Sequence, residues 1–156
     1  MKITVLILVL LGLSAYAFSQ EECGSELFVS NSDGAEELTA DRIELAFSSI
    51  EVDCLKRNAE YGEMVNKFVF LCLTHQSAAT ISILSKNKCE PFYNTVLNEI
   101  ANPVSDTFDF QTIFCNISTL DAKKTEKVRK AVLDRFTEGM LNNIPEASRI
   151  LQSDCL

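Results

Sequence analysis

Residues 61–77 read YGEMVNKFVFLCLTHQS, and their apolar side chains recur at the spacing of one face of an α-helix. Tyr61, Val65, Phe68 and Cys72 follow one another at intervals of four, three and four residues. The run FVFLCL inside this segment is apolar throughout, which is typical of a helix buried on most of its sides. We therefore expect residues 61–77 to form the central helix of the domain.

Helical periodicity recurs on both sides of this central segment. A helix is expected from Thr39, whose hydroxyl can cap it, to about Asn58. Two later segments are assigned as helices, although each also fits the alternation of a strand. One covers residues 78–86, and the other runs from a cap at Ser105 or Asp106 to Ile117. The remaining predicted helices run from Pro91 to the turn at Asn102–Pro103, from residues 118–121 to Asn143, and from Pro145 toward Leu151. The sequence thus predicts an all-α fold, a compact bundle of five or six short helices.

The N-terminus is expected to be a signal peptide that covers residues 1–17. A short basic start precedes an almost unbroken apolar run of 11 residues, Ile3–Leu13, which is too short to span a bilayer. An A-x-A cleavage site follows and ends at Ala17, so we expect cleavage there or after Ser19. An uncleaved membrane anchor is the alternative. Residues 18–156 then form a single disulfide-stabilised helical domain with no membrane span, and the protein is secreted.

Export brings all six cysteines of the chain into an oxidising compartment. An even number of cysteines in such a chain predicts a disulfide framework, here about three bridges with 15 pairings open. Two of the six lie near the mature termini, where they are expected to clamp the chain ends or to link two subunits in a disulfide-linked dimer. A non-covalent dimer is the other oligomer considered. The six cysteines are Cys23, Cys54, Cys72, Cys89, Cys115 and Cys155.

The charge of the chain restricts its partners. The formal net charge is −8, and removal of the leader takes away Lys2 and no acid, which makes it −9. Such an acidic surface repels nucleic acid and anionic lipid. No cofactor or metal is expected, because the chain has no C-x-x-C pair, calcium loop, phosphate-binding glycine motif or dinucleotide fingerprint. An extracellular protein or a small hydrophobic ligand remains as the partner.

Catalysis by a Ser-His-Asp arrangement would depend on His75, the one histidine of the chain. Its context, LTHQS, contains no known nucleophile motif, so we expect a surface histidine near a helix end and no enzyme activity. A small secreted hydrolase is kept as a third alternative.

One modification motif is present at Asn116, which begins the triplet Asn-Ile-Ser at residues 116–118. In a chain that enters the secretory pathway this triplet is an acceptor for N-linked glycan. Glycosylation requires Asn116 to face water while its neighbours Cys115 and Ile117 face inward.

Two classes of function follow from this composition. The first is a non-enzymatic binding or interaction protein of extracellular fluid, of the kind found in saliva, venom, seminal fluid or immune modulation. The second is a carrier of a small hydrophobic ligand in a helical cavity, suggested by ten phenylalanines and no tryptophan, although plain core packing also accounts for them. A carrier requires an enclosed cavity of roughly 300 Å³ or more, whereas an exposed apolar patch favours a protein partner. The residues expected to line a carrier cavity are Phe47, Phe68, Phe110, Phe114 and Phe136.

Overall fold

The computed structural model describes residues 23, 24, 26, 28, 38–105, 107–121, 123–152 and 155. These residues contain eight α-helices and no strand, so the predicted all-α class is confirmed, with more helices than the expected five or six. The signal peptide predicted at residues 1–17 lies outside the described residues. The helices are α3 (Ala40–Ser48), α4 (Val52–Arg57), α5 (Ala59–His75), α6 (Ser77–Lys86), α7 (Pro91–Ile100), α8 (Phe110–Ser118), α9 (Glu126–Asn143) and α10 (Ala147–Leu151).

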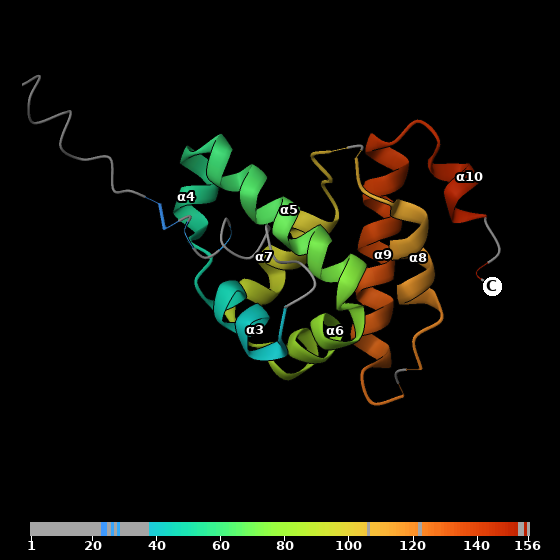
Figure 1. The fold of residues 1–156 in the computed structure, drawn as a ribbon, viewed down its shortest axis with the longest axis horizontal. Coiled ribbons are helices and arrows are strands. Elements are labelled where there is room, and N and C mark those ends of the chain that lie inside the picture. The colour runs from blue at the N-terminus through green and yellow to red at the C-terminus, as the bar shows by residue number, and fades with distance from the viewer. Residues whose placement is uncertain are drawn as a thin grey trace, which may run out of the picture.

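Helix α5 is the central element, as its sequence predicts. It packs against α4, α6, α7 and α8, and it connects the two ends of the molecule in Figure 1. Helices α3 and α4 lie at one end, and α8, α9 and α10 lie at the other. The apolar run in the second half of α5 faces neighbours on several sides, so many of its side chains are buried. The buried residues of α5 are Tyr61, Val65, Asn66, Phe68, Val69, Phe70, Cys72 and Leu73.

The core contains two groups of aromatic rings, which meet α5 through Phe68 and Phe70 on different faces of this helix. In the first, Phe68 meets Phe28 and Phe47 edge to face, with ring centroids 5.6 and 6.0 Å apart. In the second, Phe70 contacts Phe108 and Phe110. Edge-to-face and offset pairs are the arrangements that the ring quadrupoles favour. The aromatic side chains of the sequence therefore hold the two ends of the bundle onto one helix.

The helix predicted from Thr39 to Asn58 is wrong in its length, because the structure divides this stretch into α3 and α4. The hydroxyls of Ser48 and Ser49 donate to the carbonyls of Leu45 and Ala46, which competes with continuation of the helix. The backbone N–H of Glu51 then donates to the hydroxyl of Tyr61 at 2.9 Å instead of to a helical carbonyl. The chain therefore turns at residues 49–51 before α4 begins.

The predicted starts of α8 and α9 are also wrong. The cap of α8 is Asp109, whose Oδ1 accepts the N–H of Thr112 at 3.0 Å, while Ser105 accepts the N–H of Thr107 within the preceding turn. Helix α9 begins at Glu126, not at residues 118–121. The segment predicted at residues 78–86 is helical, as α6, so its strand alternative is excluded.

A buried polar contact joins α5 to the end of α7. Asn66 is fully buried, and its Nδ2 donates to the carbonyls of Glu99 and Asn102 and to the Glu99 carboxylate, at 2.9 to 3.0 Å. Its Oδ1 accepts the N–H of Val104 at 3.2 Å. The side chain of Asn66 thereby bonds to a carbonyl in the last turn of α7 and to backbone groups of the segment that follows it.

Stability should depend on pH through Glu99. Desolvation raises the pKa of Glu99 above its ordinary value, and the hydrogen bond from Asn66 offsets part of that rise. The folded state therefore favours the protonated form of Glu99. The stability that this preference provides is complete below the ordinary pKa of glutamate and is lost as the pH rises through the raised pKa of the folded state. Glu99→Gln should therefore unfold at higher urea than wild type at pH 8, with a difference that shrinks toward pH 4. Exposed Glu63 supplies the control, and an advantage for Glu63→Gln of equal size and pH dependence would contradict the assignment.

Close packing of α9 on α7 requires glycine at position 139. A Cβ atom there would lie 2.7 Å from the carbonyl oxygen of Ala101 and 2.9 Å from that of Ile100, both backbone atoms that cannot rotate away. Gly139→Ala should therefore lower the free energy of unfolding by about 1 to 3 kcal/mol. Gly62→Ala is the matched control, because its nearest atom is 3.9 Å away and alanine favours a helix interior by about 0.5 to 1 kcal/mol. Urea unfolding of both variants measures the contrast, and equal effects would refute it.

Candidate functional site

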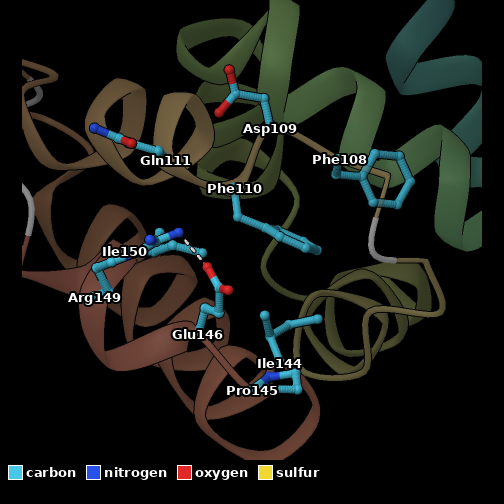
Figure 2. A pocket seen from close by; sticks show the side chains of 9 residues that line it. All are labelled: Phe108, Asp109, Phe110, Gln111, Ile144, Pro145, Glu146, Arg149 and Ile150. Carbon is cyan, nitrogen blue, oxygen red and sulfur yellow. Dashed lines mark hydrogen bonds and ion pairs between the residues drawn. The ribbon is translucent and has the colours of Figure 1, made fainter.

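An open hollow of about 470 Å³ lies between the start of α8 and the connection from α9 to α10. Figure 2 shows side chains from two stretches that are far apart in the sequence and meet around it. Its lining is formed by Phe108, Asp109, Phe110, Gln111, Ile144, Pro145, Glu146, Arg149 and Ile150. We call this hollow the α8–α10 groove.

The floor of the groove is continuous with the aromatic core. Phe108 stacks on Phe70 of α5 with centroids 4.9 Å apart, and Phe110 meets the same ring edge to face at 5.9 Å. Phe110 is 4% exposed, whereas Phe108 is half-buried, and both contribute to the lining of the hollow. The floor is therefore fixed by core packing, and its exposed part is apolar.

The opposite wall comes from the start of α10 and the residues before it. Ile144 and Ile150 are half-buried against the core, and Pro145 is exposed. A disulfide between Cys115 of α8 and Cys155, with Cα atoms 5.2 Å apart, ties the chain beyond α10 to the helix on the other side of the groove. The two walls are thus covalently linked.

The rim of the groove is charged. Glu146 and Arg149 form an ion pair whose side chains are 63% and 81% exposed, so water screens much of its strength. Asp109 lies at the start of α8 with its side chain directed away from Phe110 in Figure 2. Hydrogen bonds from the backbone N–H and the hydroxyl of Thr112 lower the pKa of Asp109, so its carboxylate is charged at neutral pH.

A second hollow, of about 420 Å³, lies near the start of α9. Its described lining residues are all polar or charged: Ser82, Asp121, Lys123, Lys124 and Thr125. Small-molecule and anchor-residue sites are mostly apolar, so the α8–α10 groove is the better candidate of the two.

The expectation of three disulfides is wrong, because the structure contains two. Cys23 is bridged to Cys54 and Cys115 to Cys155, and Cys72 and Cys89 are free. Cys23 and Cys155 are therefore not joined to each other: Cys23 is bridged to α4 and Cys155 to α8.

The environments of Cys72 and Cys89 explain the missing bridge. Cys72 lies on the buried face of α5 and is fully enclosed, whereas Cys89 is exposed in the turn that follows α6. Burial raises the pKa of the Cys72 thiol far above its ordinary value, which keeps this sulfur protonated and unreactive. Cys72 acts as a small apolar core residue.

The five phenylalanines proposed for a carrier cavity do not surround one space. Phe47, Phe68 and Phe136 are at most 1% exposed and pack against other core rings. Phe114 is half-buried and packs against the core, and Phe110 belongs to the floor of the α8–α10 groove. All five belong to the core or pack against it, and Phe110 alone of them also lines the groove.

Asn116 is engaged in a contact between helices. Its Nδ2 donates at 2.9 Å to the carbonyl of Thr74, in the last turn of α5 where that oxygen has no helical partner. The side chain is half-buried. Glycosylation of Asn116 stays a prediction. A glycan on its Nδ2 would have to be accommodated at the hydrogen bond to Thr74 that joins α8 to α5.

His75 is exposed at the end of α5, the position that its sequence predicts. Over the described ranges, no group of three or more histidine, cysteine, aspartate or glutamate side chains is placed to hold a metal ion. No single helix in the described part is long and apolar enough to cross a membrane, although α5 and α6, bent by 114°, satisfy length and composition together.

Sequence periodicity alone did not identify the groove. It placed Pro145 at a helix start and Ile150 on an inward face, but it gave no indication that residues 144–150 would meet residues 108–111. Comparison with protein-family models, curated proteins and solved structures gives no match, so any function must be inferred from these residues.

The state of the cysteines can be tested by alkylation. Iodoacetamide should modify one thiol per native chain, at exposed Cys89, because the Cys72 thiol is buried and protonated. Unfolding in guanidinium without a reductant should expose Cys72 and add a second modification, which peptide mass mapping locates. A chain that takes up no reagent in guanidinium would instead contain the third bridge.

Proposed function

We propose that this protein is a secreted, non-enzymatic binding protein of extracellular fluid that recognises another protein through the α8–α10 groove. The groove itself is the observation that carries the proposal, because it joins an apolar floor to a charged rim on a rigid, disulfide-linked frame. Disulfides of this kind are typical of oxidising, extracellular compartments, which supports the secreted location.

The shape of the groove favours a protein partner over a carried small molecule. A carrier encloses most of its ligand, and small-molecule sites bury 70% or more of the ligand surface. The α8–α10 groove is open to solvent, and the phenylalanines that might have lined an enclosed cavity pack against one another. An open apolar hollow with a polar rim suits one anchor side chain of a larger partner.

Carriage of a small hydrophobic ligand is the second candidate. The volume of the groove, about 470 Å³, falls inside the range typical of small-molecule sites and keeps this candidate open. The two functions differ in what the purified protein should contain.

Fragment titration monitored by NMR tests the groove as a binding site. Neutral aromatic fragments such as 3-phenylpropanol should shift the amide signals of Phe108, Ile144 and Ile150 in the isotope-labelled protein. Pro145→Tyr places a ring on the wall of the groove and should weaken binding about tenfold or more. Ser148→Tyr is the matched control, since Ser148 is exposed on α10 outside the lining.

Two results would contradict the proposal. One is the absence of shifts at the groove with every fragment, and the other is equal binding by wild type and Pro145→Tyr. Native mass spectrometry of protein secreted from a eukaryotic host separates the two candidates, because a co-purified lipid that Pro145→Tyr expels would favour the carrier.

A further inference from the structure

Resting on the proposed function, we infer that the α8–α10 groove selects a basic segment of its partner: an apolar side chain that enters the groove beside a lysine or arginine that stays at the rim. The inference depends on which charges surround the groove and which of them are already neutralised.

The end of α9 supplies negative potential to one wall. This helix has 18 residues and ends at Asn143, directly before Ile144 and Pro145 of the lining. The aligned peptide dipoles of a long helix place about half a negative charge at its C-terminal end. The last turn of α9 contains no basic residue, so its own sequence leaves that charge uncompensated.

The start of α8, on the opposite wall, does not attract an anion in return. A helix start has positive potential and free N–H groups, which often bind anions. Here the Asp109 carboxylate already occupies that place, with 3.0 Å to the N–H and 2.7 Å to the hydroxyl of Thr112. The positive potential at the start of α8 is therefore neutralised from within the chain.

The ion pair at the rim does not reverse this balance. The guanidinium of Arg149 is paired with the carboxylate of Glu146, so the two contribute little net potential at a distance. With the dipole of α8 offset by Asp109, the end of α9 leaves the groove negative, and the net charge of −8 on the chain acts in the same direction. The exposed part of the Phe108 ring adds a surface on which a cation is attracted to the π electrons.

Charge-matched peptides test the preference. The probes are acetyl-Gly-Phe-Lys-Gly-amide and the same peptide with glutamate or glutamine in place of lysine. We expect the lysine peptide to bind about fivefold or more tightly than the glutamate peptide at low salt, with a ratio that falls as salt is raised. Glu146→Gln should remove or reverse this preference, since it leaves Arg149 unpaired. Glu138→Gln removes one charge of the same sign on α9 outside the lining and should leave the ratio unchanged.

Each remaining outcome decides against the inference. Equal or tighter binding of the glutamate peptide overturns it, and so does an equal loss of preference in Glu138→Gln, which would make the effect one of total charge. Binding of neutral fragments without a difference among the peptides leaves the binding function standing and refutes the basic partner alone. Binding of free phenethylammonium as tightly as the lysine peptide would make a small amine, rather than a polypeptide segment, the ligand.

Discussion

The packing of Phe70 against Phe108 and Phe110 is the contact on which both the core and the groove depend. Phe70 is fully buried in α5, and its ring is 4.9 Å from Phe108 and 5.9 Å from Phe110 between centroids. Phe108 is only partly buried and belongs to the lining of the groove. A change in the angle of α5 would therefore move the floor of the groove, because close-packed interiors transmit displacement.

The spacing of apolar residues predicted the helices whose formation depends on residues near one another in the sequence. Helices α5, α6 and α7 lie close to where their apolar spacing places them. The break between α3 and α4 depends on the hydroxyl of Tyr61, ten residues away from the N–H of Glu51 that it accepts. The groove likewise requires residues 108–111 to meet residues 144–150. Contacts of this range leave no trace in spacing, so the groove was not predictable from sequence.

The cysteines show where a sequence pattern has two physical meanings. Cys72 continues the apolar face of Tyr61, Val65 and Phe68, and that position suits a bridge to another helix or a small buried side chain equally well. The even number of cysteines favoured the bridge, but that number does not say which sulfur atoms lie close enough to join. The two cysteines stay unpaired because Cys72 is enclosed by the core while Cys89 is at the surface.

The positions of the two disulfides follow from where packing is weakest. Helix α5 is surrounded by core neighbours and needs no covalent support, whereas α4 and α10 have six and five residues and bury little surface of their own. One bridge fixes α4 to Cys23, and the other fixes the chain after α10 to α8. The second bridge closes a loop of 40 residues that contains all of α9, so it restricts the separation of the two groove walls in every state of the chain. The wall of the α8–α10 groove that a short helix and a connecting segment form is thus held to α8 by a covalent bond as well as by packing.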